Sequence, residues 1–447
     1  DRGDPRPDPR LDGLEPPKEP AQPGVRVRAV NSREHGPSHR AQLLAAPAAS
    51  DPPHARADGR PGAEIHMPMD VTIDHARLLA AVSAAASIAE KRSVAGSTSI
   101  NGVLLDATRK GITVTATDML LTSSELLGVR VDTEVTTEGG ALVSARHLLD
   151  VVKTMPSGAI RLRSLENHWI EITARRSSFK LMGQAPSEFP EIPAAPKDKD
   201  FVKVPAAAIT SQILATVASI STDEARVNLN GLLWESNGKR SVAVSTDGHR
   251  LTKIGLDLAG GPKLERGVII PRKGVTAIQA LLARSKATDV ELGFGGNTAW
   301  LYVRVGGQTL TIKLNNVVFP PYEQVIPTKV LREAVVDREE LTVMLKRACV
   351  MAPEKTATVR LAITAKTKTL DLTADNPDLG TVSDSVELVS YTGGDILAGY
   401  NAHYLIEALS VMLTKQVKMT MQGELDPLVL QPVDGPDFLA VVMPMRV

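Results

Sequence analysis

The chain has 447 residues, and its 51 basic and 51 acidic side chains give a formal net charge of zero. This length predicts about two to four domains, and an apolar content of 43% is enough for ordinary globular cores. No apolar run is long enough to span a bilayer, and a single cysteine, Cys349, excludes both a disulfide framework and a zinc site built from cysteines. We therefore expect a cytoplasmic protein.

Residues 1–68 differ in composition from the rest of the chain. They hold 13 of the 30 prolines and show neither strand alternation nor helical apolar spacing. Such a segment cannot bury enough apolar surface to offset the entropy lost on ordering. We predict a disordered, Pro-rich N-terminal extension, which is either a tether or binding arm or, as we favour, a dispensable tail.

Beyond residue 68 the chain repeats itself at a nearly constant interval. A strand that feeds an Ala/Leu-rich helix begins three times, at Val71, Val202 and Val335, with intervals of 131 and 133 residues. A second unit of this kind begins at Leu142, Val268 and Ile396, with intervals of 126 and 128 residues. Internal repeats of this kind reveal the architecture before any single motif does.

Strands with period-two apolar alternation keep the same interval, and each ends in an aspartate: Asp118, Asp247 and Asp375. The repeats predict an α+β protein of three similar domains, at residues 69–195, 196–328 and 329–447, joined by Pro-rich connectors. Each domain would contain two β-α-β-β-β modules, in which a helix buries one face against antiparallel strands.

The predicted helices carry a net positive charge, and the rest of the repeated part is correspondingly negative. The strongest cluster is Pro271-Arg272-Lys273-Gly274 at a helix start, where cations oppose the helix dipole. Phosphate is a candidate for the compensating charge, and contact with phosphate is indifferent to base sequence. A solvated helix face is the alternative interpretation for any one of these residues.

No arrangement of residues supports catalysis. The stretch Thr246-Asp247-Gly248-His249-Arg250-Leu251 offers an acid, a base and a hydroxyl, but catalytic triads are assembled from distant segments. An Asp-Gly turn at the end of a strand explains Asp247 and Gly248 without chemistry. The sequence has no phosphate-binding glycine loop, and its nine histidines are scattered, so we expect no cofactor and no metal.

This stretch and the C-terminal residues make the family recognisable. Thr246 to Leu251 and the terminal Val441-Val442-Met443-Pro444-Met445-Arg446-Val447, with Val268 to Gly274 and Phe319-Pro320-Pro321-Tyr322, resemble the bacterial DNA polymerase III β subunit, the sliding clamp. The resemblance covers residues 69–447. It implies a non-catalytic processivity subunit that forms a head-to-tail homodimeric ring around duplex DNA, with helices lining the hole and sheets outside. The implied partners are the polymerase catalytic subunit, the clamp loader, other polymerases and repair proteins, all bound through short peptides, and no membrane.

The resemblance also carries over residue by residue. It implies DNA contacts at Arg92, Arg272 and Lys273, and a subunit interface at Phe179, Leu181, Val350 and Met351. Methionine suits a surface that accepts many partner sequences, and an arginine at its edge would meet acidic peptide flanks. The implied peptide-binding pocket, between the second and third domains, consists of Leu229, Thr246, Gly248, His249, Arg250, Leu251, Pro320, Gln324, Val325, Val441, Met443, Pro444, Met445 and Arg446.

Two alternatives concern the packing of these residues. Val441 to Met445 could be an ordinary final core strand. Phe179 and Leu181 could pack in a core, because they alternate as strand residues do.

Two others concern function. Gln324 stands where the family's pocket often has an arginine, which fits a specialised, for example drug-insensitive, copy of the clamp. Val227-Asn228 stand where the family can carry tyrosines at a DNA contact.

An enzyme that uses Asp247 and His249 is the remaining rival. Replacement of His249 by alanine would separate the enzyme from the clamp: lost peptide binding without any turnover supports the clamp.

Overall fold

The computed structural model describes residues 68–89, 99–353 and 356–446. All of them belong to one unit of the chain, Glu64–Val447. The predicted N-terminal extension and the proposed DNA contact Arg92 lie outside the described residues. Within the described ranges, no helix has both the length and the apolar character needed to cross a membrane.

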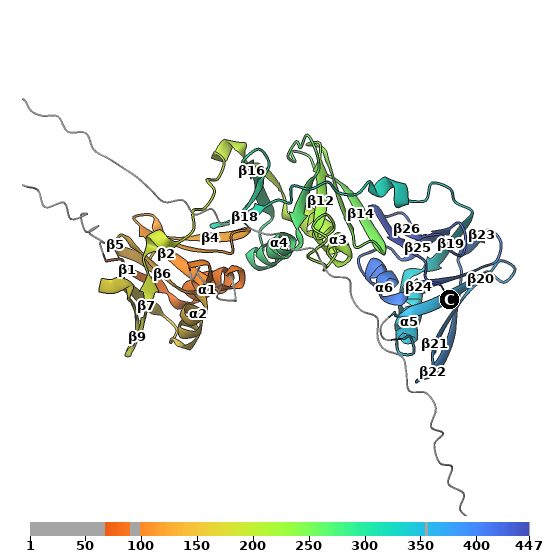
Figure 1. Ribbon diagram of the computed structural model, residues 1–447, viewed down its shortest axis with the longest axis horizontal. Coiled ribbons are helices and arrows are strands. Elements are labelled where there is room, and N and C mark those ends of the chain that lie inside the picture. Colours follow the sequence, from red (N-terminus) through yellow and green to blue (C-terminus); the bar gives the residue numbers. More distant parts are fainter. Residues whose placement is uncertain (1–67, 90–98, 354–355, 447) are drawn as a thin grey trace, which may run out of the picture. The chain divides into compact units, whose positions relative to one another are not determined.

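A module of one strand, one helix and three further strands occurs six times along these residues (Figure 1). Short strands β5 (Thr133–Thr137) and β10 (Gly183–Gln184) follow the two modules of the first domain. Those two modules are β1 (Asp70–Asp74), α1 (His75–Ile88), β2 (Gly102–Thr108), β3 (Gly111–Thr117) and β4 (Leu121–Gly128), then β6 (Gly139–Ser144), α2 (Ala145–Thr154), β7 (Ala159–Ser164), β8 (Ile170–Ala174) and β9 (Ser177–Leu181).

The second and third domains repeat this order, so the predicted α+β class and its modules are confirmed. The second contains β11 (Val202–Pro205), α3 (Ala206–Thr216), β12 (Gly231–Ser236), β13 (Arg240–Thr246) and β14 (Arg250–Asp257), then β15 (Val268–Pro271), α4 (Arg272–Ser285), β16 (Asp289–Gly295), β17 (Trp300–Val305) and β18 (Gln308–Lys313). The third contains β19 (Arg332–Asp337), α5 (Arg338–Cys349), β20 (Thr358–Thr364), β21 (Thr369–Asn376), β22 (Gly380–Glu387) and the short β23 (Ser390–Thr392), then β24 (Ile396–Asn401), α6 (Ala402–Ser410), β25 (Gln416–Met421), β26 (Leu428–Pro432) and β27 (Asp437–Val442). The domain boundaries at residues 195 and 328 stay predictions.

The last residue of a module's first strand also begins its helix. Asp74 Oδ1 accepts hydrogen bonds from the backbone N–H groups of Ala76 (2.9 Å) and Arg77 (3.2 Å). Asp337 and Asn401 cap α5 and α6 in the same way. Such caps satisfy N–H groups that the first helical turn leaves free. In the second domain, α3 and α4 instead follow Pro205 and Pro271, which make no side-chain cap.

Two nine-stranded sheets join neighbouring domains. In the first sheet β4 pairs antiparallel with β18, and the strand order is β10-β6-β2-β3-β4-β18-β17-β16-β11. In the second sheet β14 pairs antiparallel with β27, and the strand order is β15-β12-β13-β14-β27-β26-β25-β19-β23. We call these two pairings the first and second seams. A five-stranded sheet, β5-β1-β7-β8-β9, and a four-stranded sheet, β22-β21-β20-β24, complete the first and third domains.

The two seams differ in chemistry. A single cluster of buried apolar side chains runs through the second and third domains, and among described residues it takes only Ile88 and Leu121 from the first domain, whose own core is separate. The first seam is instead lined by hydroxyl and amide groups, such as the 2.8 Å bond from Gln308 Nε2 to Ser123 Oγ. Buried apolar residues support both seams, because Leu121 of β4 faces Ile312 of β18, and the first seam adds side-chain hydrogen bonds across it.

Candidate functional site

The turn between β13 and β14 is built around Asp247. Its Oδ1 accepts the backbone N–H groups of His249 (2.9 Å) and Arg250 (3.0 Å), and Gly248 takes the positive φ of +92° that this turn requires. His249 is exposed, and no hydrogen bond joins its ring to Asp247 in the part of the chain that the structure describes. The structural interpretation of this Asp-Gly pair is confirmed, and the geometry gives the enzymatic rival no acid–base pair.

Each nitrogen of the Arg250 guanidinium group has a partner within the protein. Nε contacts Asp247 Oδ2 at 3.1 Å, Nη1 pairs with Glu407 of α6, and Nη2 donates to the Ala218 carbonyl at 2.5 Å. The guanidinium carbon lies 4.2 Å from the ring centroid of Tyr404, also on α6. We call these five residues the Arg250 cluster. Only 13% of the Arg250 side chain is exposed. Through Glu407 and Tyr404, the cluster holds the β13–β14 turn in contact with the third domain.

Glu407 and Tyr404 were not among the residues that the sequence predicted for this site. Burial is the main cause that raises the pKa of the Tyr404 hydroxyl, and the Asp247 carboxylate adds to it. Both residues lie on one face of α6, more than a hundred and fifty positions along the chain from Arg250. The spacing of Tyr404 and Glu407 places them on one helix face, which a sequence pattern can predict. No local pattern indicates which arginine they contact.

The C-terminal segment completes the site from the third domain. Leu251 and Val441 face each other across the second seam, and both are buried. Val441 is thus a strand residue within a core, as the alternative interpretation held. Met443, beyond the end of β27, donates its backbone N–H to the His249 carbonyl at 2.9 Å, and Met445 donates to the Gly399 carbonyl at 2.8 Å. Met443 to Met445 are half-buried, and Arg446 is exposed.

The connector between the second and third domains packs on the same apolar surface. Phe319 and Tyr322 join Leu251 and Val441 in one buried cluster. Of the other predicted pocket residues, Pro320, Leu229 and Thr246 are half-buried, whereas Gly248, Gln324 and Val325 are exposed. The turn, the connector and the C-terminal segment therefore meet at one place, and the exact membership of the pocket stays a proposal.

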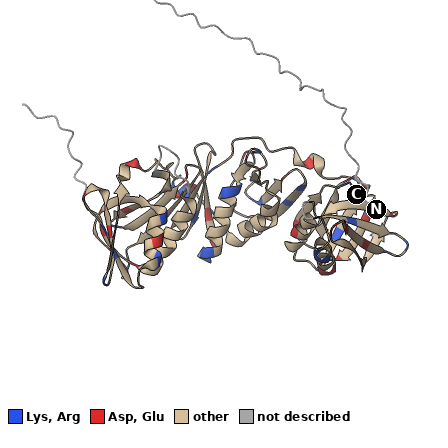
Figure 2. Cartoon of the chain, turned by 60° about the horizontal axis from the view of Figure 1, so that its bottom comes forward, with Lys and Arg blue, Asp and Glu red and all other residues tan. Residues whose placement is uncertain are grey.

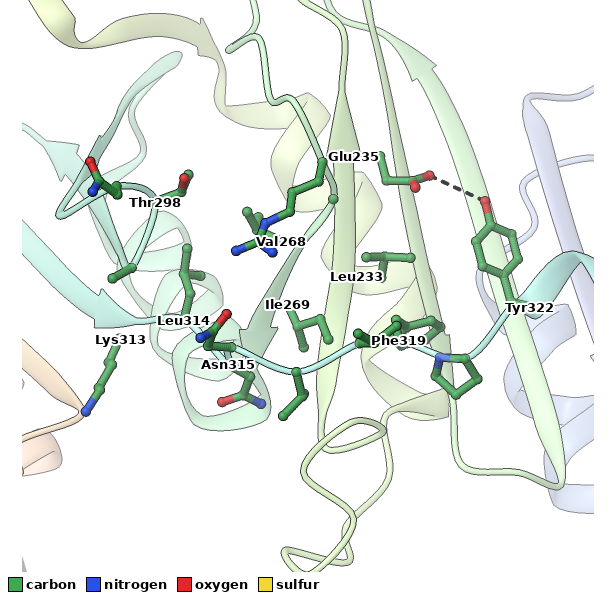
Figure 3. Close-up of a pocket in the computed structure, with 18 of the residues that line it drawn as sticks. Leu233, Glu235, Val268, Ile269, Thr298, Lys313, Leu314, Asn315, Phe319 and Tyr322 are labelled. Atoms are coloured by element: carbon green, nitrogen blue, oxygen red, sulfur yellow. Dashed lines mark hydrogen bonds between the residues drawn. The ribbon is translucent and has the colours of Figure 1, made fainter.

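A cavity of about 640 Å³ lies beside this connector, within the second domain (Figure 3). Leu233, Ile269 and Phe319 form part of its apolar wall, and the Tyr322 hydroxyl points to Glu235 Oε2 at 3.4 Å. Burial is the main cause that raises the pKa of Tyr322, with the Glu235 carboxylate next. The cavity shares only Pro320 with the predicted pocket. No cluster of three metal-ligating side chains occurs among the described residues.

The two described residues predicted to contact DNA are both engaged within the protein. Arg272 Nη1 donates to the carbonyl of Ile220 at 2.6 Å, and Lys273 Nζ forms an ion pair with Asp118 of the first domain. The Asp118 side chain is almost fully buried, while half of the Lys273 side chain is exposed. Figure 2 shows acidic and basic residues interspersed along helices and strands. Because Lys273 is paired with Asp118, a DNA phosphate would have to compete with the Asp118 carboxylate for the Lys273 ammonium group.

The predicted subunit-interface residues lie near the open edges of two sheets. Phe179 and Leu181 belong to β9, an edge strand; Phe179 is 39% exposed, and Leu181 packs in part against the first domain's core. Val350, which follows α5, is 68% exposed. Core packing is therefore wrong for Phe179 and holds in part for Leu181. Met351 is half-buried.

Three family models match this chain in tandem. The N-terminal domain of the DNA polymerase III beta subunit matches residues 69–193, the central domain matches residues 203–321, and the C-terminal domain matches residues 323–446. Together they span most of the chain, in the order that the internal repeats predict.

Named relatives and solved structures agree with the models. A beta sliding clamp from Pseudomonas aeruginosa is 30% identical over 378 residues, which is 85% of this chain and 100% of the relative. A sliding clamp structure from the same species, bound to griselimycin, has a TM-score of 0.77 and 29% identity over 85% of this chain and 100% of that one. A Bacillus subtilis clamp, at 20% identity and a TM-score of 0.79 over 85% of this chain and 99% of that one, shares the fold. The chain belongs to the DNA polymerase III beta subunit family, the β sliding clamps.

Proposed function

We propose that this chain works in the cytoplasm as a homodimeric sliding clamp that encircles duplex DNA and makes the replicative polymerase processive. It is not itself an enzyme: the polymerase activity resides in a partner subunit. Polymerases, the clamp loader and repair proteins bind it through short peptides. The observation that carries this proposal is the way in which the six modules are joined.

Each seam joins the last strand of one module to the last strand of another. The first seam joins the last strands of the first and fourth modules, and the second joins those of the third and sixth. The last strands of the second and fifth modules, β9 and β22, are sheet edges within the described part of the chain. A third seam of the same kind would pair β9 of one copy with β22 of another.

Pairing β9 with β22 is a heterologous, head-to-tail contact, which closes into a ring when the rotation fits. Unpaired edge strands expose backbone donors and acceptors that another chain can satisfy. The exposed side chains of Phe179 and Val350 supply apolar area beside these edges. Two copies joined by two such contacts make a closed ring of six domains.

Such a ring holds DNA by topology and not by tight binding. Phosphate contacts are equivalent at every register, so they allow sliding. The helix cations, with Arg272 and Lys273 among them, supply this contact. Sequence-specific readout is not needed, because the clamp must travel over any template.

The surface formed by the β13–β14 turn, the connector and Met443 to Arg446 is the proposed docking place for partner peptides. The seam between two domains borders this surface. Half-buried methionines adapt to different apolar anchors, and Leu251, Val441 and Phe319 form a firm apolar support beneath them.

The test uses the full-length chain. Light scattering should give the mass of two chains, and after loading by a clamp loader the protein should stay on nicked circular DNA and leave the same DNA once it is linearised. A monomer that is retained equally by both forms of DNA would overturn the proposal, because it would show ordinary electrostatic binding.

A further inference from the structure

We infer that Arg250 is a positioning residue that sets the geometry of the peptide site across the second seam, and that it does not itself recognise the acidic flank of a partner peptide. This inference rests on the proposed function. It departs from the expectation, drawn from the sequence, that an arginine at the pocket's edge meets peptide carboxylates.

Each of the three guanidinium nitrogens of Arg250 already has a partner within the protein. Its guanidinium group contacts two carboxylates, Asp247 and Glu407, as well as the Ala218 carbonyl, and its flat face covers the ring of Tyr404. A guanidinium has five N–H donors in a fixed fork and no acceptor. Three of these five N–H groups are bonded, two of them to carboxylates that already neutralise the single positive charge, and only 13% of the side chain is exposed to an incoming peptide carboxylate.

The Arg250 cluster lies at the end of the second seam from which the C-terminal segment continues. Arg250 opens β14 opposite Val442, the last residue of β27, and Met443 then bonds to the carbonyl of His249, the residue before Arg250. A shift of α6 relative to the β13–β14 turn would therefore move Met443 and the residues that follow it. The Arg250–Glu407 pair restrains that shift, because Glu407 lies on α6 and Arg250 is the first residue of β14, directly after the turn.

The opposite end of the same seam provides a matched control. Arg240 of β13 forms an ion pair with Asp437, the first residue of β27, and it too joins the second and third domains. It lies at the far end of the strand pair from Met443, and its side chain is 43% exposed, against 13% for Arg250. The two acidic partners are similarly exposed, 46% for Glu407 and 52% for Asp437, so the difference lies in Arg250, whose second carboxylate partner Asp247 is only 18% exposed. Breaking a largely buried pair costs more than breaking an exposed one.

If Arg250 does not bind the acidic flank of a partner peptide, another cation must do so. Arg446 is exposed beside the half-buried methionines, and its side chain has no hydrogen-bond or ion-pair partner among the residues that the structure describes. It is free to meet a carboxylate without breaking an existing contact.

The experiment measures the affinity of the full-length chain for two short fluorescein-labelled peptides, both with leucine and phenylalanine anchors, one with an aspartate in its flank and one with asparagine there. Arg250→Gln should weaken both peptides by the same factor, at least about tenfold, because it loosens the site as a whole. Arg250→Lys should recover part of the loss through Glu407, and Arg240→Gln should leave both affinities unchanged. Arg446→Gln should weaken only the aspartate peptide.

Glu407→Gln provides a second route if Arg250→Gln folds poorly. It removes a partner of Arg250 without touching the proposed peptide surface, and it should also weaken both peptides equally. Hydrogen exchange should show faster opening of the first turns of α6 in both variants.

The outcomes separate this inference from the proposed function. If Arg250→Gln weakens only the aspartate peptide, or if neither Arg250→Gln nor Glu407→Gln changes either affinity, Arg250 is not a positioning residue and the proposed site stands. If the unaltered chain binds neither peptide, the proposed site fails and this inference fails with it.

Discussion

Replacement of Phe179 by alanine should weaken the dimer strongly without unfolding the chain. Phe179 is 39% exposed on the edge strand β9, so its removal leaves little cavity in the first domain. A phenylalanine side chain has on the order of 200 Å² of surface, so β9 offers about 80 Å² of it to a second copy, which corresponds to about 2 kcal/mol per contact at about 25 cal/mol per Å². A ring with two such contacts would lose about 4 kcal/mol, a roughly thousandfold rise in the dimer dissociation constant.

Sedimentation and subunit exchange at low protein concentration measure that constant directly. Leu214→Ala is the matched control, because Leu214 is a large apolar residue of similar exposure, 47%, on α3 of the second domain. The control should dimerise normally, and both variants should melt close to the unaltered chain. An unchanged dissociation constant for Phe179→Ala would refute the placement of β9 in the subunit interface and the reasoning from shared seam positions.

Three further substitutions test the DNA contacts, the peptide site and the first seam. Asp118→Asn keeps the turn bonds of Asp118 but removes the charge that neutralises Lys273, so the log–log salt slope of DNA binding should steepen by about 0.9 per chain in an anisotropy titration. Gln324→Arg adds an exposed cation, so affinity for an aspartate-bearing peptide should rise by up to about fivefold, and that for its asparagine twin should not change. Burial is the main cause that raises the pKa of the Glu125 carboxyl on β4, so the folded state loses stability as the pH rises from the ordinary glutamate pKa through the raised one. Glu125→Gln should therefore raise the melting temperature at neutral pH, and the gain should vanish in acid, where Glu125 is protonated.

The modules could be predicted because their signals are local and repeated. Period-two alternation places β3, β13 and β21, and the Ala/Leu-rich runs place the helices that begin at Ala206 and Ala402. Asp247 could be assigned to a turn from the sequence because an Asp-Gly pair at the end of a strand usually forms one. Three copies of each signal made the assignment firmer than one copy could.

The seams could not be predicted, because strand pairing across domains leaves no local trace. Gln308 lies opposite Glu125 in the first seam, and the apolar alternation of β4 or β18 does not indicate that the two strands pair. For the same reason the partner of Lys273 was missed: Asp118 lies 155 positions away in the chain. The cavity beside the connector is lined by strands β12 and β15 together with residues 314–323, which are far apart in the sequence, and sequence patterns do not report that they meet.

The site shows a further limit of reasoning from resemblance. Arg250 was correctly placed beside a turn and a C-terminal segment that come together. The expectation that an arginine at the pocket's edge meets acidic flanks assumed a free guanidinium, however, and the role of a charged side chain depends on the charges that the fold brings to it. Glu407 and Tyr404 contact that guanidinium here, and both belong to α6 of the third domain, across the second seam from Arg250.

The three strand-end aspartates allow the subunit contact to be argued from the other two seams. At the first seam Asp118 receives two backbone N–H groups through Oδ1 and pairs through Oδ2 with Lys273, the second residue of α4. At the second seam Asp247 orders its turn in the same way and holds Arg250 against α6. In both cases an ion pair reaches from the turn to a helix of the neighbouring domain.

Asp375 is the third member of this series. It is exposed, and its carboxylate has no hydrogen-bond or ion-pair partner in the ranges that the structure describes. By position, the helix that would face it is α2 of a second copy, where Arg146 is the second residue and 88% of its side chain is exposed. Asp375→Asn and Arg146→Gln should each weaken dimerisation modestly, by up to about 1 kcal/mol per contact, and the double variant should lose less than the sum because both remove one pair. Strictly additive losses in sedimentation would show that the two side chains do not meet and that the third seam departs from the pattern of the other two.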